Sequence, residues 1–163
     1  MALVGRYEPS PVPWVREEVD HLERTGLGLR GRRVVLLSTM GARSGLIRKT
    51  PLMRVTHGGV YVAVASTAGG ERHPHWYANA LAHPEVELRD GDVVASLVAR
   101  ELSGAERTRW WSFACTAFPS YVEYQRRTSR LIPVLLLEPG EAQPSPTRAP
   151  AAAQAPSAPG DGE

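Results

Sequence analysis

Cysteine and lysine are almost absent from this sequence. Of its 163 residues one is cysteine, Cys115, and of its 19 basic residues one is lysine, Lys49. A single cysteine excludes a framework of intrachain disulfides and a zinc module built from several cysteines. No secretory signal is evident, because residues 1–13 lack the apolar stretch that such a signal needs. We therefore expect the chain to work in the cytoplasm.

Long apolar segments and a strong excess of charge are also missing. No window of about 18 apolar residues occurs, so we expect no transmembrane helix. The formal net charge at pH 7 is +2, which is low for a protein that binds duplex nucleic acid, and we expect no nucleic-acid partner. A short helix over 14–25 has a thin apolar face, which either packs on the domain or lies on a membrane surface.

The C-terminal part differs in composition from the rest of the chain. From Gly140 to Glu163 it has seven Ala, five Pro and three Gly, and no Val, Ile, Leu, Met or aromatic residue. Such a segment cannot bury enough apolar surface to offset the entropy lost on ordering, so we expect it to be disordered. The expected organisation is an N-terminal helix and lead-in over 1–32, a folded domain over 33–139 and a tail over 140–163.

Short strands dominate the middle of the chain. Apolar runs bounded by turn signals predict strands over 34–37, 48–57, 60–65, 86–88, 93–102 and 132–137. Capping boxes at Ser103 and Ser120 predict two helices, and a third is expected over 73–82. Pro133 predicts that the last strand lies at a sheet edge. The fold class is mainly β (α+β): a small barrel of about six mostly antiparallel strands with short helices outside.

Residues 39–52 carry the clearest chemical signal. Two glycines free the backbone to present its N–H groups, a serine adds a hydroxyl and three side chains supply positive charge; these residues are Gly41, Gly45, Ser44, Arg43, Arg48 and Lys49. The combination predicts a cradle for a phosphate or carboxylates. A basic hairpin turn in water is the alternative interpretation. The spacing is neither a Walker loop nor a dinucleotide fingerprint.

A loop of small residues follows the strand over 60–65. Ala65-Ser66 and Gly69-Gly70 would let a flat ligand approach the backbone closely, although a plain connector has the same composition. His73 and His75 come next, but we expect no metal site. Helical ligand pairs prefer a spacing of four, and no carboxylate or cysteine partner is near in sequence.

Two tyrosines follow the predicted helix over 103–117. Tyr121 and Tyr124 are three residues apart and therefore lie on one face of a helix. Phenols placed in this way can stack on a ring system and donate a hydrogen bond or a proton. Tyrosine pairs are also common in protein cores, so the pair alone does not define a site.

Taken in order, these segments resemble the deazaflavin-dependent nitroreductase family, whose members use reduced coenzyme F-420. Four motifs carry the resemblance: Thr39-x-Gly41-x-Arg43-Ser44-Gly45-x-x-Arg48-x-x-Pro51-Leu52, Ala65-Ser66-x-x-Gly69-Gly70, His73-Pro74-x-Trp76-Tyr77-x-Asn79, and Tyr121-x-x-Tyr124-Gln125-x-Arg127-Thr128-x-Arg130-x-Ile132-Pro133-Val134. The resemblance spans about residues 34–139. It is greatest to the actinobacterial branch that reduces quinones and bicyclic nitroimidazoles.

The resemblance implies a split β-barrel and assigns roles to individual residues. The coenzyme's phosphate and oligoglutamate tail would be held by Arg43, Ser44, Arg48 and Lys49. Motifs that line the deazaflavin ring and its ribityl chain match Pro51, Leu52, Ala65, Ser66, Gly69, Gly70, Trp76, Tyr77 and Asn79. Tyr121 and Tyr124 match the helix that closes the acceptor side, so that Ser66, Tyr121 or Tyr124 would orient the acceptor oxygen. Phe118 stands where family members often have tyrosine, which removes one hydroxyl.

The implied activity is hydride transfer from the reduced deazaflavin to a small electron-poor acceptor such as a quinone, an enone or a nitroaromatic. In such an enzyme the coenzyme supplies the chemistry and the protein positions it. One alternative is a split-barrel oxidoreductase that uses FMN, which also carries a phosphate but has no polyglutamate tail. Another is a protein that binds the deazaflavin without catalysing a reaction. Three cations near one loop favour the longer anion.

Overall fold

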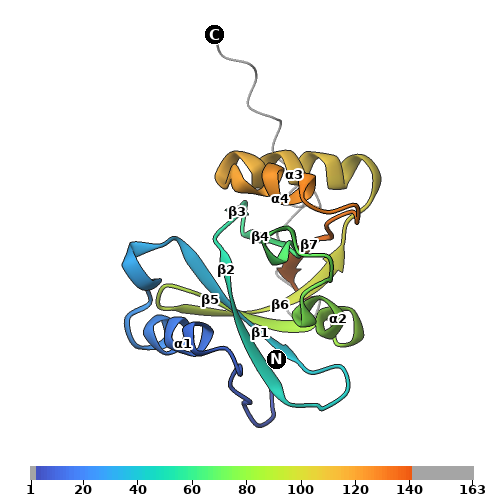
Figure 1. Ribbon diagram of the computed structural model, residues 1–163. Helices are drawn as coiled ribbons and strands as arrows, with labels where there is room; N and C mark the ends of the chain where they lie inside the picture. Colours follow the sequence, from blue (N-terminus) through green and yellow to red (C-terminus); the bar gives the residue numbers. More distant parts are fainter. Residues whose placement is uncertain (1–2, 141–163) are drawn as a thin grey trace.

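The computed structural model describes residues 3–140, and seven strands in this range form one curled antiparallel sheet (Figure 1). The strands are β1 (Val34–Met40), β2 (Ile47–Met53), β3 (Thr56–His57), β4 (Val60–Val64), β5 (Glu85–Asp90), β6 (Val93–Glu101) and β7 (Val134–Pro139). Their order in the sheet is β2-β1-β5-β6-β7-β4-β3. The Val62 N–H donates to Val55 O (2.9 Å), which brings the end of β2 close to β4. The sheet therefore curls towards closure, as the predicted small barrel requires.

Two predictions about the strands were wrong. The expected strand over 48–57 is interrupted after Met53, so that β2 and β3 are separate strands and the described residues hold seven strands where about six were expected. The last strand is not at an edge, because β7 pairs with β6 on one side and β4 on the other. Pro133 immediately precedes the first residue of β7, where its missing N–H does not interrupt the ladder.

Within residues 3–140, four helices and two single 3₁₀ turns precede or connect the strands. They are α1 (Pro13–Thr25), η1 (Leu29–Gly31), η2 (Thr67–Gly69), α2 (His75–Ala82), α3 (Gly104–Ala117) and α4 (Ser120–Arg126). The predicted helix starts after Ser103 and at Ser120 are confirmed, but neither serine caps its helix through its side chain. The acidic partner of the first predicted capping box, Glu106, binds Arg100 instead (2.8 Å). Figure 1 shows α3 and α4 together at one end of the sheet, with α1 at the opposite side.

The core lies on both faces of the sheet. Leu135 and Leu137 of β7 pack with Leu37 and Leu88 inside the barrel, and Leu136 packs with Trp110 of α3 on the other face. A strand that is buried on both faces has a continuous run of apolar residues in its sequence, and residues 134–137 of β7 form such a run.

Helix α1 packs on the domain with its apolar face. Val19 and Leu22 are fully buried against Val34 and Leu36 of β1. This packing agrees with the first of the two interpretations of the thin apolar face. Within residues 3–140 no helix has the length and apolar content that crossing a membrane would require. The predicted disordered tail falls on residues 141–163, outside the described range, apart from Gly140.

Candidate active site

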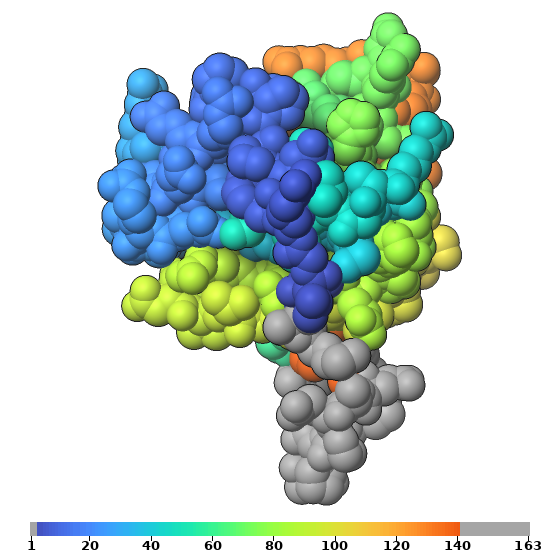
Figure 2. All heavy atoms as spheres, turned by 90° about the horizontal axis from the view of Figure 1, so that it is seen from below, coloured from blue at the N-terminus to red at the C-terminus, as the bar shows by residue number. Residues whose placement is uncertain are grey.

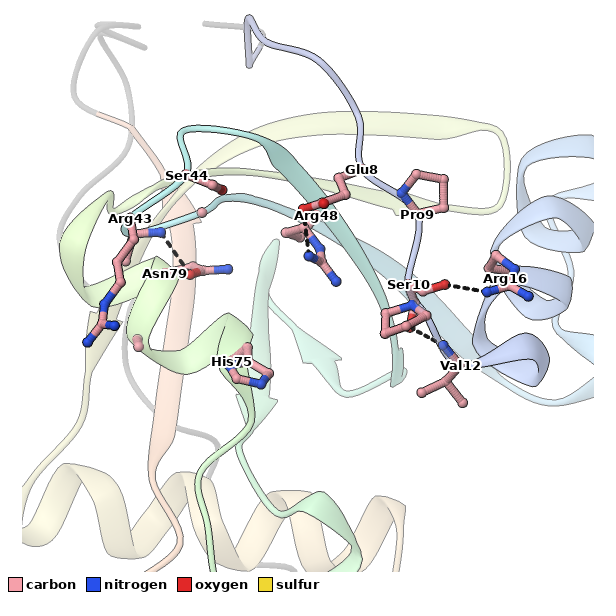
Figure 3. A pocket seen from close by; sticks show the side chains of 14 residues that line it. Glu8, Pro9, Ser10, Val12, Arg16, Arg43, Ser44, Arg48, His75 and Asn79 are labelled. Atoms are coloured by element: carbon pink, nitrogen blue, oxygen red, sulfur yellow. Dashed lines mark hydrogen bonds and ion pairs between the residues drawn. The ribbon is translucent and has the colours of Figure 1, made fainter.

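Two cavities of different character lie side by side. We call the first, of about 1040 Å³, the cationic cavity; it is lined by Glu8, Pro9, Ser10, Pro11, Val12, Arg16, Gly41, Ala42, Arg43, Ser44, Arg48, His75, Ala78 and Asn79 (Figure 3). We call the second, of about 460 Å³, the aromatic pocket; it is lined by Trp14, Val15, Arg32, Val34, Thr50, Pro51, Leu52, Met53, Val64, Ser66, Thr67, Ala68, Pro74, Trp76, Phe118, Tyr121 and Tyr124.

The two cavities are neighbours because the same elements build both. Strand β2 places Arg48 in the cationic cavity and Pro51 in the aromatic pocket. Helix α2 places Asn79 in the first and Trp76 in the second, and α1 also contributes to both. A ligand that spans them would have a flat apolar end and a polar, negatively charged end.

The loop between β1 and β2 forms the wall of the cationic cavity. The Gly41 N–H donates to Leu46 O (2.8 Å), and Gly45, with φ of 69°, turns the chain back towards β2. Buried Asn79 fixes the loop from α2, because its Oδ1 accepts from the Ala42 N–H (2.9 Å). The loop of the predicted anion cradle thus lines the cationic cavity, and a hydrogen bond from its Ala42 N–H attaches it to Asn79.

The predicted cations differ in their availability. Arg43 is exposed and forms no ion pair within the described residues, so it is free to bind an anion. Arg48 donates to Glu8 (2.9 Å), a contact visible in Figure 3. Lys49 binds Glu23 and lines neither cavity. The N-terminal region therefore supplies its own carboxylates to two of the three cations.

The aromatic pocket has hydroxyl groups that remain available to a ligand, among them those of two tyrosines and a serine. Ser66, Tyr121 and Tyr124, to which the resemblance gave a role on the acceptor side, all line this pocket. None of their hydroxyls takes part in a hydrogen bond with another group of residues 3–140. Hydroxyls that face a cavity without an internal partner can donate to a bound ligand.

The tyrosines are held by edge-to-face packing. The ring centroids of Tyr121 and Phe118 are 5.0 Å apart, and those of Tyr121 and Tyr124 are 6.2 Å apart. Burial raises the pKa of Tyr121 well above its usual value, and the neighbouring Tyr124 and Cys115 raise it further. Tyr121 is therefore protonated at neutral pH and can act as a hydrogen-bond donor.

Three predicted residues support the wall of the aromatic pocket without lining it. Ala65 is fully buried, and its N–H donates to Pro133 O (2.9 Å). Gly69 has φ of 81°, and a Cβ there would lie 2.8 Å from Tyr124 O, so only glycine lets η2 pack this closely on α4. Gly70 ends the same turn, with its N–H bonded to Thr67 O (2.9 Å).

Tyr77 does not line the aromatic pocket, where the resemblance placed it, and the two histidines have different surroundings. Tyr77 lines neither cavity; its hydroxyl donates to Glu101 (2.7 Å), and burial together with this hydrogen bond raises its pKa to about 12. His73 contacts Arg130 (2.9 Å), while His75 lines the cationic cavity. Among residues 3–140 no group of three or more potential ligands could hold a metal ion.

The sequence did not indicate the N-terminal contribution to the site. Trp14 lines the aromatic pocket with 59% of its surface exposed, and Arg16 lines the cationic cavity. Figure 2 shows the N-terminal segment as a strip across the surface beside the loop between β1 and β2. The one available signal was a large aromatic residue on a helix with a thin apolar face.

A curled antiparallel barrel, with a cationic cavity beside an aromatic pocket, is typical of a class of split-barrel oxidoreductases that bind a flat, anionic redox coenzyme. Residues 14–139 match the family described as F420H(2)-dependent quinone reductase. The chain belongs to this family, so the predicted deazaflavin coenzyme and oxidoreductase class are confirmed.

Known relatives and solved structures agree with this assignment. The F420H(2)-dependent quinone reductase Rv1261c of Mycobacterium tuberculosis is 36% identical over 127 residues, which cover 72% of this chain and 85% of the relative. Another protein of that organism, the putative F420H(2)-dependent quinone reductase Rv3178, is 31% identical over 71% of this chain and 98% of its own.

Two solved structures share about half of their sequence with this chain. The structure of an F420-H2 dependent reductase, FDR-A, is 51% identical, covers 66% of this chain and 95% of its own, and superposes with a TM-score of 0.62. A structure described as a domain-swapped dimer is 48% identical, covers 79% of this chain and 100% of its own, and has a TM-score of 0.65. The split-barrel fold predicted from the sequence is thereby confirmed.

Proposed function

We propose that this protein reduces a quinone with the deazaflavin ring bound in the aromatic pocket and the coenzyme's anionic tail in the cationic cavity. The observation that carries the proposal is the joint construction of the two cavities by α1, β2 and α2. One end offers aromatic and apolar walls for a ring, and the other offers Arg43 and a polar loop for negative charge. This fits an elongated coenzyme better than FMN, whose single phosphate needs fewer cations.

The chemistry that the coenzyme supplies when bound is transfer of a hydride to an electron-poor acceptor. A quinone that accepts one hydride and one proton becomes a hydroquinone, so the site must also stabilise the oxygen on which negative charge develops. Ser66, which precedes η2, and Tyr124 of α4 both have free hydroxyls in the aromatic pocket and would donate to that oxygen. Protonated Tyr121 adds a third donor.

The pocket walls would also control orientation. Pro51 and Leu52 of β2 form an apolar wall, and Trp76 of α2 is nearly completely buried and so keeps its position. A ring held against these walls would present one face to the acceptor. Such orientation lowers the entropic part of the activation free energy.

The test is a fluorescence titration of the purified protein with the oxidised deazaflavin coenzyme and, in parallel, with FMN. We expect the protein to bind the deazaflavin selectively. In a second assay, menadione should oxidise the reduced coenzyme in the presence of the protein, as measured by the change in the coenzyme's absorbance. Preferred binding of FMN would overturn the coenzyme assignment. Binding of the deazaflavin without any acceptor-dependent oxidation would instead identify a carrier protein.

A further inference from the structure

The loop between β4 and α2 has an unusual backbone. Thr67, Ala68 and Gly69 have φ values of 42°, 51° and 81°. Two of these residues carry a Cβ, which is disfavoured in the left-handed region, so the conformation must be supported by its surroundings. The support matters because Ser66, Thr67 and Ala68 form one wall of the aromatic pocket.

Arg130 supplies this support from outside the pocket. Its Nε donates to Gly70 O (2.8 Å). Its Nη2 donates to Ser66 O (2.9 Å) and to Thr67 Oγ1 (3.0 Å). Its Nη1 donates to Ala65 O (3.1 Å). Arg130 itself lines neither cavity.

The remaining donor of the guanidinium reaches the end of the loop. Nη1 of Arg130 lies 2.9 Å from Nδ1 of His73. A guanidinium has five N–H donors in a rigid planar arrangement, and here each has an acceptor between Ala65 and His73. A lysine ammonium has three donors at one point and cannot reproduce this pattern.

We propose that Arg130 is a positioning residue for the reaction: it holds the Ser66–Ala68 wall in the shape that receives the coenzyme ring. It acts through the loop and does not touch the ligand. The inference rests on the proposed function, because it assumes that the aromatic pocket receives the ring. It assigns to Arg130 a role in binding and turnover beyond that of an ordinary fold-stabilising residue.

The experiment compares Arg130→Lys with Arg126→Lys. Arg126 is an exposed arginine of α4 whose partner is Glu123 (2.7 Å), and it provides the same change of side chain away from the loop. Two probes are titrated: the full deazaflavin coenzyme and the deazaflavin chromophore without phosphate or tail. We expect Arg130→Lys to weaken both at least tenfold and by the same factor, because the tail site is unchanged. Arg126→Lys should stay within twofold of the wild type.

Two further measurements separate positioning from general stability. Hydrogen–deuterium exchange of the ligand-free protein should show faster exchange for the amides of residues 66–70 in Arg130→Lys, with the strands of the sheet unchanged. Ethylguanidinium at low millimolar concentration should restore part of the lost affinity of Arg130→Ala, while urea at the same concentration should not. Neither measurement depends on turnover.

The outcomes are distinguishable from those for the proposed function. If the wild type binds neither probe, the proposed function fails, and the exchange data still report on the loop. If the wild type binds both and Arg130→Lys binds equally well, the positioning role is overturned. A loss of affinity that matches only the unfolded fraction, measured by thermal unfolding, would overturn it as well.

Discussion

At the scale of single residues, the site depends on a few polar groups that the fold leaves without internal partners. The hydroxyls of Tyr124 and Ser66 and the guanidinium of Arg43 face cavities and bind no other group of residues 3–140. In contrast, Tyr61 and Tyr77 have their hydroxyls bound to carboxylates. A free polar group at a cavity wall is a more specific indication of ligand binding than the residue type alone.

The first prediction concerns Tyr124. Tyr124→Phe removes the hydroxyl that we propose as a donor to the acceptor oxygen and leaves the ring packing against Phe118 and Tyr121 in place. We expect kcat for menadione reduction to fall about tenfold, because one lost donor costs roughly 1.4 kcal/mol in the transition state. The dissociation constant of the coenzyme, measured by fluorescence, should change by less than about twofold, since one factor of two is only roughly 0.4 kcal/mol.

Tyr61→Phe serves as the matched control for this prediction. It removes a phenol hydroxyl that binds Asp90 (2.7 Å) and lines neither cavity. Its kcat should stay near that of the wild type. If Tyr124→Phe abolishes coenzyme binding, α4 belongs to the coenzyme side and the assignment of that helix is wrong.

At the scale of elements, the N-terminal segment attaches to the free edge of β2 through an isolated parallel β-bridge between Tyr7 and Ile47. The Glu8 N–H donates to Ile47 O (2.9 Å), and the Ile47 N–H donates to Arg6 O (2.8 Å). This attachment brings the Glu8 carboxylate to Arg48 in the cationic cavity. An anionic ligand therefore meets a cation that is already neutralised by the chain itself.

The second prediction follows from this competition. Glu8→Gln frees Arg48, and we expect the variant to bind the coenzyme up to about fivefold more tightly at low ionic strength, which corresponds to the roughly 0.2–1 kcal/mol of a partly exposed ion pair. The gain should shrink in 0.5 M salt because screening weakens the contact between ions. Glu17→Gln, at an exposed position of α1, changes the net charge equally and should have little effect. Equal gains for both variants would contradict a local role for Glu8.

Elements could be predicted from the sequence where the signal is local. The apolar runs of β1, β4 and β7 and the turn at Gly91 gave strands within a few residues of their observed bounds. The order of strands could not be predicted, because it depends on pairing between distant segments. Pro133 led to a wrong prediction of an edge strand for this reason. It lies one residue before β7, where its missing N–H does not prevent β7 from pairing on both sides.

The same limit applied to the site. Arg48 of β2, Trp76 of α2 and Tyr121 of α4 line the cavities and were named from the sequence because each lies in a short motif, whereas Lys49 and Tyr77 line neither cavity. The supporting contacts were not predicted, since Arg130 reaches residues 57 to 65 positions earlier and Asn79 reaches Ala42, 37 positions earlier. Contacts of this length have no periodic signature in a single sequence.

At the scale of the whole molecule, one polar cluster joins three strands where the barrel curls. Arg54 follows β2, Asp90 ends β5 and Tyr61 lies in β4. Arg54 Nε donates to both carboxylate oxygens of Asp90 (2.9 Å each), and the Tyr61 hydroxyl donates to the same carboxylate (2.7 Å). Burial alone would raise the pKa of Asp90, but the hydrogen bonds from Arg54 and Tyr61 outweigh it and hold the pKa below its usual value.

The third prediction is the pH dependence that follows from this cluster. Because the pKa of Asp90 is lower in the folded state, its contribution is present above the unfolded pKa of about 3.9 and is lost as the pH falls through the folded value. We expect Asp90→Asn to reduce the free energy of unfolding at pH 7 by about 1 kcal/mol, since the pair is partly exposed. Urea unfolding should show this difference narrowing below about pH 4. A difference that stays constant down to pH 3 would show that the charge of Asp90 is not the cause.

The position of β7 has a consequence for the order of events during synthesis. This strand is the last one in the described chain, yet it lies between β6 and β4. Until the ribosome has released residues 134–139, the earlier strands can form only two separate groups, each with an open edge. Tyr121 and Tyr124 are also made late, so the nascent chain has no complete aromatic pocket. The chain that still lacks β7, with its unpaired strand edges, is therefore the species most prone to aggregation.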